Sequence, residues 1–295
     1  MVTFRRSVIK GIPYYYLEHS VRDGKKVRKI RKYLGRRLPK NIEVLKESFH
    51  FEINKQRYFD RFDQIKKGYA RENRSVQESA REKEIRSFSI RFTYDSQKIE
   101  GSSLTLRETA QLLEEGITPN NKSVADVKEA EAHQKVFLEM LSYERDLRLS
   151  LILYWHEKLF KNTKPEIAGR IRKHQVTISG SKFVPPSPVE VYPMLTEVLR
   201  WYEARKNRFD TVQLAGIINL RFVSIHPFAD GNGRIARLIM NFLLKKNGFP
   251  MMDINYESRK AYYNALERSN LKNDDSIFLN WFFKKYLREN ENYLS

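Results

Sequence analysis

The feature that most constrains this chain is a single string, His226-Pro227-Phe228-Ala229-Asp230-Gly231-Asn232-Gly233-Arg234-Ile235-Ala236-Arg237. An apolar run ends at Ile225, and apolar residues at helical spacing follow from Leu238 onward. A Gly-Asn-Gly loop that opens a helix lets backbone N–H groups approach an anion without Cβ obstruction. The helix start adds unpaired N–H donors and positive dipole character. The string therefore predicts a phosphate cradle at a helix start.

The polar side chains of the string suit the same chemistry. His226 titrates near neutrality and can serve as a general base, and Asp230 is a hard oxygen ligand suited to Mg²⁺ shared with phosphates. Arg234 lies in the first helical turn and Arg237 one turn later on the same face, so both can reach phosphate oxygens. Each residue alone also has a structural reading, as a turn histidine or a helix N-cap. The combination is what indicates a phosphate-handling site.

Composition limits the class of protein. The 295 residues include no cysteine, so disulfides and thiolate metal sites are excluded. No apolar run approaches the roughly 20 residues that a membrane span needs. The first ten residues are mixed and basic, without the apolar core of a signal peptide. We therefore expect a cytoplasmic protein that does not engage a membrane.

Positive charge is concentrated at the N-terminus. Of the net +19, residues 1–75 hold 21 Lys and Arg against 8 Asp and Glu. Residues 13–35 predict a β-hairpin turning at Asp23-Gly24, and residues 42–72 predict a helix. Tyrosines at 14, 15, 16 and 33 stand among the cations, so residues 1–40 are a candidate nucleic-acid surface. A well-solvated basic surface is the open alternative.

The rest of the chain predicts mostly helix. The expected helices span residues 76–97, 105–115, 126–143, 149–161, 188–206, 211–224, 233–246, 259–270 and 276–293. Residues 175–183 are different, because they are β-like, end in Gly and Ser and precede two prolines. They predict a small hairpin or flap.

The string from His226 to Arg237 resembles, without departures, the signature of Fic-domain proteins, His-Pro-Phe-x-Asp/Glu-Gly-Asn-Gly-Arg-x-x-Arg. The resemblance covers roughly residues 80–285. It implies a mainly α, Fic-type helical bundle with a small β-hairpin flap, preceded by a basic β-hairpin plus helix extension. The expected divisions are an extension over residues 1–75, an inhibitory helix region over 76–104 and a catalytic core over 105–295.

The resemblance implies a protein adenylyltransferase, which moves AMP from ATP to a Ser, Thr or Tyr hydroxyl of a target protein and releases pyrophosphate. In that role His226 deprotonates the hydroxyl and Asp230 holds Mg²⁺. Asn232 and the amides of Gly231 and Gly233 support the α-phosphate. The two arginines contact the phosphates, with Arg237 on the γ-phosphate. The Doc-like branch, which transfers phosphate itself, has Lys where this chain has Gly233, so Gly233 favours nucleotidyl transfer.

A second stretch, Ser96-Gln97-Lys98-Ile99-Glu100-Gly101, resembles the inhibitory motif of the family in the subclass with an N-terminal inhibitory helix. The resemblance implies that Glu100 pairs with Arg237, which removes the cation meant for the γ-phosphate and repels that phosphate. Ser96 is expected to orient this switch. Alternatively, Glu100 simply ends a helix at Gly101.

Three more residues are assigned by resemblance alone. Tyr263 is expected to stack on the adenine and Asn270 to hydrogen-bond its edge, although an ordinary amphipathic helix with Tyr in the core remains an alternative. Ile178 of the flap is expected over the nucleotide or the target side chain, where the flap lines the target peptide by strand addition. Gly169-Arg170-Ile171-Arg172 resembles the Gly-x-x-Arg lead-in to that flap.

Other functions stay open. Within catalysis, the chain is alternatively a de-AMPylase, with Glu100 placing a water, or a transferase for another nucleotide. Of a different class is a nucleic-acid-binding regulator that acts through the N-terminal hairpin. Relatives with the inhibitory arrangement often dimerise, so a homodimer is also expected from the resemblance.

Overall fold

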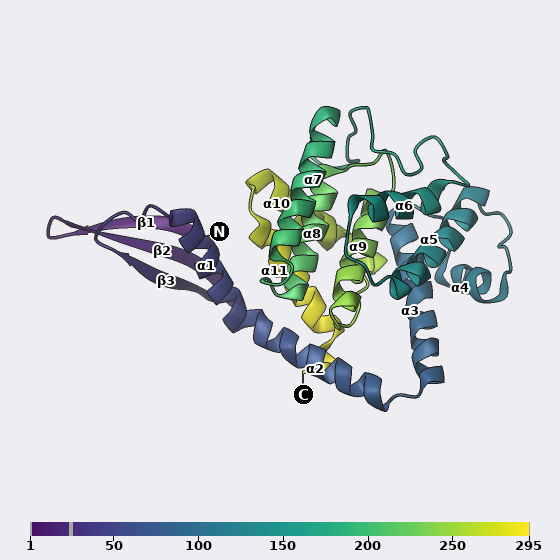
Figure 1. Cartoon of the computed structure of the whole chain (residues 1–295), viewed down its shortest axis with the longest axis horizontal. Coiled ribbons are helices and arrows are strands. Elements are labelled where there is room, and N and C mark those ends of the chain that lie inside the picture. Colours follow the sequence, from purple (N-terminus) through teal and green to yellow (C-terminus); the bar gives the residue numbers. More distant parts are fainter. Residues whose placement is uncertain (1, 24–25, 295) are drawn as a thin grey trace. The chain divides into compact units, whose positions relative to one another are not determined.

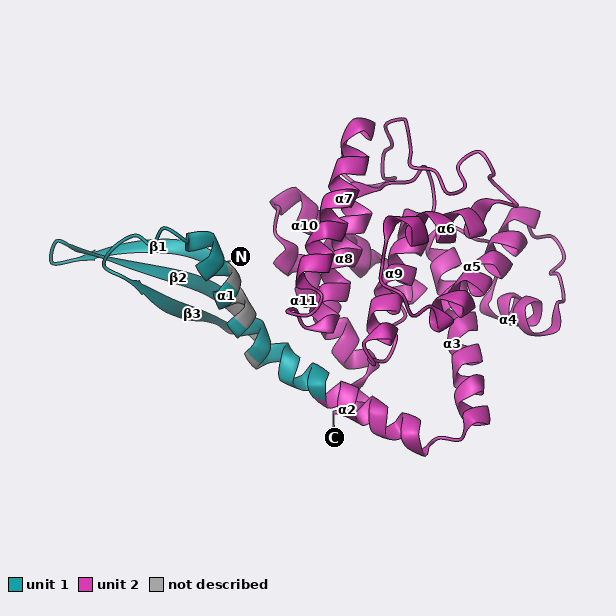
Figure 2. Ribbon diagram, in the orientation of Figure 1, with its two compact units in different colours: residues 1–63 teal, residues 64–295 magenta. Residues whose placement is uncertain are grey.

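The computed structural model describes residues 2–23 and 26–294, which form two compact units, residues 1–63 and residues 64–295 (Figure 2). The division falls inside helix α2, Asp60–Ser75. In the described part of the chain, no helix is both long and apolar enough to cross a membrane.

The first unit is built on an antiparallel sheet in the order β1-β2-β3, with strands Val2–Ile9, Ile12–Asp23 and Lys26–Gly35. The predicted hairpin is confirmed by the pairing of β2 with β3, and β1 is an addition that the sequence pattern did not indicate. Lys10 and Gly11 join β1 to β2 with φ of 49° and 78°. Two positive φ values give a turn whose twist matches that of the strands. Gly24, in the other predicted turn, lies outside the described residues.

One face of this sheet packs on helix α1, Ile42–Asn54. The centre of the contact is Leu17, fully buried against Phe49 and Ile53. Leu17 and Phe4 are paired across β1 and β2, so their side chains share that face. The helical path predicted for residues 42–72 is confirmed, although a π-helical stretch, Lys55–Phe59, interrupts it before α2.

The second unit is a helical bundle (Figure 1), and the helices predicted for it are confirmed to within a few residues. They are α3 Glu78–Ile99, α4 Leu106–Glu115, α5 Val124–Ser142, α6 Leu149–Phe160, α7 Pro188–Arg205, α8 Thr211–Ile225, α9 Asn232–Lys246, α10 Arg259–Lys272 and α11 Asp275–Glu289. Short 3₁₀ turns lie at Tyr256–Ser258 and Glu291–Tyr293. The last predicted helix therefore ends at Glu289 rather than at Tyr293.

Helix α9 lies in the core of the bundle and contacts α8, α3, α5 and α6. Every side chain from Arg234 to Leu244 is buried. Helix α3 packs against both α5 and α9, which brings its C-terminal end to the start of α9. Because such close packing leaves little freedom, the loop between α8 and α9 is held in one place.

The predicted hairpin over residues 175–183 is wrong. The segment forms a loop with a turn at Ser179 and Gly180, closed by a hydrogen bond from the Ser181 N–H to the Ile178 carbonyl at 3.0 Å. No strand forms anywhere in residues 64–294. The β-like composition is insufficient because a strand needs a hydrogen-bonded neighbour.

Candidate active site

The loop from His226 to Gly231 joins α8 to α9. His226 caps α8 in the left-handed conformation, with φ 52° and ψ 59°, and its N–H donates to the Phe222 carbonyl at 3.1 Å. A non-glycine residue adopts this conformation at a cost, which the surrounding structure must offset. The imidazole Nδ1 lies 3.2 Å from the Val223 carbonyl oxygen, a pure acceptor, so Nδ1 carries the proton and Nε2 keeps a free lone pair.

The charge state of His226 suits a base. Burial lowers the pKa of His226 below its ordinary value, and the Val223 carbonyl and Glu100 only partly oppose this effect. The imidazole is therefore neutral at neutral pH and can accept a proton at Nε2.

Asn232 fixes the shape of the loop. Its side-chain oxygen accepts from the Phe228 N–H at 2.8 Å, and its side-chain nitrogen donates to the Phe228 carbonyl at 2.9 Å. Both polar ends of this buried amide are thus used within the loop. The backbone N–H of Asn232 lies in the first turn of α9, so it is the group of this residue that stays available for the role expected at the α-phosphate.

The start of α9 forms an anion site from backbone groups. Gly231 takes the N-cap position with φ 81°, and no described side chain caps this helix. The N–H groups in the first turn of a helix have no carbonyl partner inside it. The Gly231 N–H itself donates to Asp230 Oδ1 at 2.5 Å, so the expected amide of Gly231 is already engaged. A Cβ on Gly231 would collide with the ring of Phe160.

Asp230 and Arg234 belong to a charged network behind the loop. Arg234 is 2% exposed, donates to Asp230 Oδ1 at 3.0 Å and to Gln97 Oε1 at 3.0 Å, and pairs with Glu129. Lys164 Nζ lies 2.7 Å from Asp230 Oδ2 and 3.0 Å from Glu129 Oε1. Arg234 thus binds carboxylates and an amide in this structure, whereas the sequence predicted that it contacts the nucleotide phosphates.

Asp230 keeps its negative charge in this network. Burial alone would raise the pKa of Asp230, but Arg234 and Lys164 outweigh it and hold the pKa below its ordinary value. Within the described residues, no three His, Cys, Asp or Glu side chains gather as a metal site. A single ionised carboxylate nevertheless fits Mg²⁺ that is bound mainly through substrate phosphates and water.

Arg237 is the most enclosed cation of the site. It is 0% exposed, and its Nε donates to the Ser96 hydroxyl at 3.1 Å while Nη2 donates to the Ser96 carbonyl at 3.0 Å and to Glu100 Oε1 at 2.7 Å. Its Nη1 finds no hydrogen-bond partner among the described residues. Burial disfavours the guanidinium charge, but Glu100 together with Tyr262 and Tyr263 outweighs burial and raises the pKa of Arg237.

Glu100 reaches this position from the end of α3. It is the C-cap residue, and Gly101 follows with φ 101°, so Glu100 both ends the helix and pairs with Arg237. A Cβ on Gly233 would overlap Glu100 Oε1 and lie 3.0 Å from Arg237 Nη1. Gly233 therefore leaves the space that the Glu100 carboxylate fills.

The residues proposed for adenine and target lie on α10 and the flap. Tyr263 is 43% exposed, and its hydroxyl lies 3.4 Å from the Ile99 carbonyl, next to Glu100. Asn270 Oδ1 accepts from the Ser224 hydroxyl at 2.6 Å. Ile178 is half-buried at the flap turn, which Glu267 of α10 holds by accepting from the Lys182 N–H at 2.6 Å.

Besides Glu129 and Lys164, two further residues position the loop in roles that the sequence did not predict. One is His156 of α6, fully buried, whose Nδ1 accepts from the Gly169 N–H at 3.0 Å and whose Nε2 donates to the Asp230 carbonyl at 3.0 Å. Its ring stacks on Phe228 at 3.7 Å between centroids. Burial lowers the pKa of His156 to about 4, so the ring is neutral and links the loop to the flap lead-in.

The other is Arg172, which sequence analysis named only as part of the flap lead-in. Its guanidinium donates to the carbonyls of His226 at 2.7 Å, His174 at 3.0 Å and Pro186 at 2.6 Å. A cation at the end of α8 is favoured by the negative pole of the helix. Arg172 thus ties both ends of the flap to the residue proposed as base.

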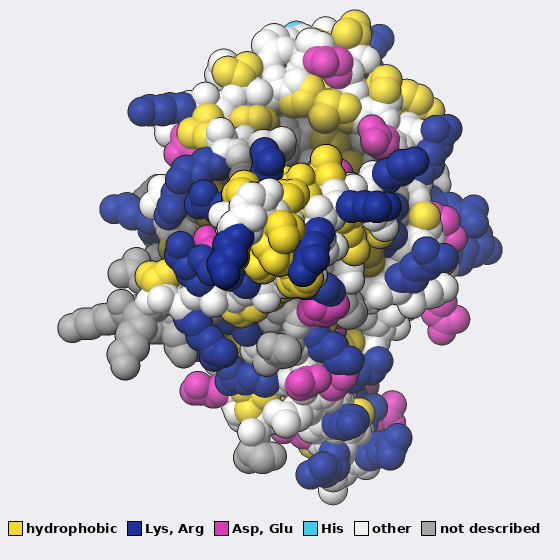
Figure 3. All heavy atoms as spheres, turned by 90° about the vertical axis from the view of Figure 1, so that its left-hand side faces the viewer, with side chains coloured by type: hydrophobic (Ala, Val, Ile, Leu, Met, Phe, Trp, Pro, Cys, Tyr) yellow, Lys and Arg dark blue, Asp and Glu magenta, His cyan; other side chains and the backbone are white. Residues whose placement is uncertain are grey.

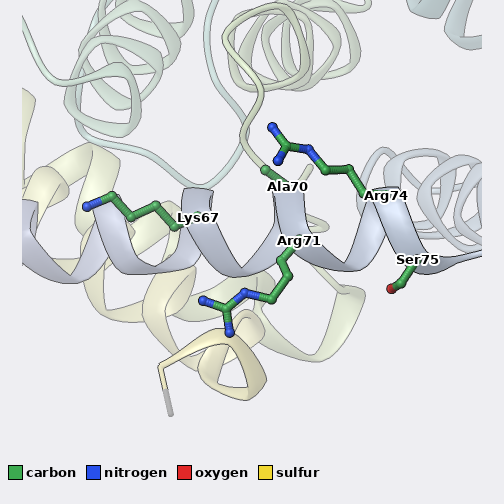
Figure 4. Close-up of a pocket in the computed structure, with 5 residues that line it drawn as sticks. All are labelled: Lys67, Ala70, Arg71, Arg74 and Ser75. Carbon is green, nitrogen blue, oxygen red and sulfur yellow. The ribbon is translucent and has the colours of Figure 1, made fainter.

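The hollow shown in Figure 4 is not this site. Its lining residues are Lys67, Ala70, Arg71, Arg74 and Ser75, all from α2. None of them comes from the His226 loop or from the helices that carry Glu100 and Arg237. The candidate catalytic residues therefore lie around the start of α9 and not in this hollow.

Comparisons with known proteins agree with this geometry. Residues 146–244 match the Fic/DOC family. Protein adenylyltransferase fic-1 of Caenorhabditis elegans is 34% identical over 186 residues, which are 61% of this chain and 36% of that protein. Protein adenylyltransferase Fic of Drosophila melanogaster is 31% identical over 181 residues, 60% of this chain and 36% of that protein. The chain thus spans about a third of the length of these curated relatives.

Solved structures of Fic proteins have a fold similar to that of this chain. A Fic-domain-containing signaling protein from Bacteroides thetaiotaomicron superposes with a TM-score of 0.71 at 28% identity, covering 79% of this chain and 95% of that one. Fic-1 from Caenorhabditis elegans superposes with a TM-score of 0.71 at 26% identity, covering 86% of this chain and 77% of that one.

Proposed function

We propose that this chain, whose residues 146–244 match the Fic/DOC family, is a protein adenylyltransferase that Glu100 holds inactive. It transfers AMP from ATP to a Ser, Thr or Tyr hydroxyl of a target protein and releases pyrophosphate. This proposal rests on one observation: the protein's own carboxylate, that of Glu100, occupies a place suited to a phosphate. The Glu100 carboxylate lies at the start of α9, over Gly233 and 2.7 Å from Arg237 Nη2, where a nucleotide phosphate would bind.

His226 acts as the base. Its neutral imidazole accepts the proton of the target hydroxyl at Nε2 while the hydroxyl oxygen attacks the α-phosphorus. The bond from that phosphorus to the oxygen bridging to the β-phosphate breaks, and the electron pair leaves with pyrophosphate. Burial lowers the pKa of His226, which favours the neutral imidazole that can act as the base.

Backbone N–H groups at the start of α9 stabilise the charge that develops on the α-phosphate. The groups in question belong to Asn232 and Gly233, the first two residues of the helix. The Asn232 side chain serves this role indirectly, because it locks the loop through Phe228. Arg234 likewise positions Asp230 rather than reaching the nucleotide in this state.

Asp230 would hold Mg²⁺ through a carboxylate oxygen, and the ion would neutralise charge on the nucleotide phosphates. Its fit rests on an ionised carboxylate beside the N–H groups of the helix start. Lys164 shares Asp230 Oδ2 at 2.7 Å in this state and would yield that oxygen.

Arg237 receives the γ-phosphate once Glu100 has left. Arg237 Nη1, which has no hydrogen-bond partner among the described residues, and the space over Gly233 that Glu100 would vacate are the places for the incoming oxygens. The carboxylate and the γ-phosphate are both anions, so they compete for one guanidinium. Ser96 holds Arg237 in the inhibited geometry through its hydroxyl.

The nucleotide base and the target lie toward α10 and the flap. Tyr263 would stack on the adenine with its exposed ring, and Asn270 would hydrogen-bond the base edge. Ile178 would contact the nucleotide or the target side chain from the flap turn, which Glu267 anchors.

The test is transfer of label from ATP labelled on the α-phosphate, with Mg²⁺, to the protein itself or to added proteins. Glu100→Gly is expected to raise incorporation by about tenfold or more, the range of typical coupling energies. Glu100→Gly with His226→Ala is expected to abolish it. A matched control is Glu115→Gly, because Glu115 is exposed and also ends a helix before a left-handed glycine, Gly116.

Further arms separate the rival activities. Label from the γ-phosphate would indicate phosphoryl transfer, and higher incorporation from GTP, UTP or CTP would indicate another nucleotide. Loss of AMP from a labelled target, dependent on Glu100, would indicate de-AMPylation. No incorporation by Glu100→Gly from any nucleotide would overturn the transferase proposal.

A further inference from the structure

The sheet of the first unit leaves one face open. Leu17 and its neighbours cover the face against α1. Alternate residues along a strand point to opposite faces, and residues paired across strands share a face. The pairs on the open face are Thr3–Glu18, Arg5–Tyr16, Ser7–Tyr14, Tyr16–Tyr33, Glu18–Arg31 and Ser20–Lys29.

Positive charge in this unit is concentrated in residues 1–40, where eight Lys and Arg lie in the three strands. Residues 1–40 contain 13 Lys and Arg against 2 Asp and Glu, whereas residues 41–63 contain 4 against 5. Residues 41–63 are thus close to neutral, and residues 1–40, which include the sheet, carry the excess. On the side of the whole molecule that Figure 3 draws, Lys and Arg side chains are more widespread than Asp and Glu.

A single carboxylate on the open face is outnumbered by cations. Glu18 lies 2.7 Å from Arg31 Nε, 3.3 Å from Lys29 Nζ and 4.0 Å from Arg5 Nε. These three side chains are 63%, 56% and 64% exposed, whereas Glu18 is 7% exposed beneath them. Glu18 therefore orders the cations, and their surplus charge faces solvent.

The tyrosines of this face are packed against one another. The Tyr33 ring lies 6.1 Å from that of Tyr14 and 5.3 Å from that of Tyr16, and Arg36 lies over Tyr14 at 5.4 Å. Tyr33 is 51% exposed, whereas Tyr14 and Tyr16 are partly buried, so the face offers one open ring rather than the series of rings on which successive unpaired bases stack. Beside Tyr33, the exposed groups are the guanidinium and ammonium groups of Arg5, Lys29 and Arg31, which can contact phosphates and base edges in duplex DNA.

We propose that the open face of this sheet binds duplex DNA. Its 12-residue central strand is about 40 Å long, comparable with the roughly 34 Å of one DNA turn. Sheets enter the grooves of B-form DNA, whereas the major groove of duplex RNA is too deep and narrow for side chains to read. None of the residues involved belongs to the His226 site, so this activity is independent of AMP transfer.

The experiment measures fluorescence anisotropy of a labelled 20-base-pair duplex of arbitrary sequence with the full chain, between 50 and 200 mM NaCl. Binding is expected to weaken linearly in log–log coordinates as salt rises. Replacing Arg5, Lys29 and Arg31 by Ala is expected to lower affinity by about tenfold or more and to reduce the slope by about 3. A matched control replaces the exposed Arg268, Lys272 and Arg288 of the second unit by Ala and is expected to leave binding unchanged.

A variant that keeps the three positive charges tests whether weaker binding comes from lost charge or from a folding defect. Arg5→Lys, Lys29→Arg and Arg31→Lys together keep three cations and are expected to bind duplex DNA like the unaltered chain. Circular dichroism checks that both triple variants keep their structure. The proposal is overturned if no binding occurs at 50 mM NaCl or if the control triple loses as much affinity. It is also overturned if single-stranded DNA, duplex RNA or polyglutamate displaces the duplex at equal charge.

Discussion

The carboxylate of Glu100 lies 2.7 Å from the fully buried guanidinium of Arg237, directly over the residue position that lacks a Cβ, Gly233. The pair joins the end of α3 to the second turn of α9. The buried half of α3 thereby carries the anion that we propose competes with the nucleotide.

Removing this anion is expected to weaken the fold and strengthen nucleotide binding. Glu100→Gln leaves Arg237 buried without a carboxylate, which costs about 1–3 kcal/mol because Glu100 is partly reached by water. Thermal unfolding should show a lower Tm than the unaltered chain in buffer and a larger rise on adding ATP. An unchanged response to ATP would contradict the competition between Glu100 and phosphate.

The Ser96 hydroxyl is expected to support inhibition. Ser96→Ala removes the hydrogen bond to Arg237 Nε, worth about 1 kcal/mol, and should raise label incorporation from ATP by about fivefold. Ser89→Ala is the matched control, because Ser89 is equally buried on the same helix but bonds to Arg86 and Gln134. Equal incorporation by the two variants would exclude a specific role for Ser96.

Gly233→Ala is expected to fold but not to transfer nucleotide. The added Cβ meets the ends of two flexible side chains, Glu100 and Arg237, and Ala favours a helix over Gly by about 1 kcal/mol. It also occupies the space proposed for a phosphate, so incorporation should stay absent even with Glu100→Gly.

Gly231→Ala provides the contrast to Gly233→Ala. It combines φ 81° with a collision against the Phe160 ring, and we expect a loss of about 2 kcal/mol or more by chemical denaturation. If Gly233→Ala proved as unstable as Gly231→Ala, the account of the space over Gly233 would be wrong.

Acid is expected to destabilise the bundle through His156. Its pKa falls from 6.5 to about 4 on folding because of burial, so the neutral form is favoured in the folded state. The associated stability is complete above pH 6.5 and is lost as pH falls toward 4, by about 3 kcal/mol. Urea unfolding between pH 4 and 8 measures this loss.

His156→Gln is the variant that checks the assignment. The Gln amide can donate and accept as the imidazole does, but it does not titrate in this range. It is expected to lower stability at pH 7 and to flatten the pH dependence between pH 6.5 and 4. A profile as steep as that of the unaltered chain would assign the acid effect to other groups, such as the buried His133.

The sequence determined the local features of this protein. The string around Gly231 and Gly233 predicted a helix start with free N–H groups, and helical spacing predicted the helices of the bundle, because both depend on neighbouring residues. Strand β1 was missed because its residues do not alternate clearly, and it forms by pairing with β2. The opposite error was made for the flap. Its residues are β-like in composition, so strands were predicted, but no neighbouring strand pairs with them.

Only the tertiary structure decided how these parts act together. His156, Glu129, Lys164 and Arg172 come from separate elements and meet the loop through contacts that no local pattern encodes. Likewise, the expected roles of Arg234 and Asn232 shifted once their polar atoms were found engaged with Glu129 and Phe228. A motif specifies residue types and spacing, but long-range packing decides which donor faces which acceptor. That packing places Glu100 on Arg237.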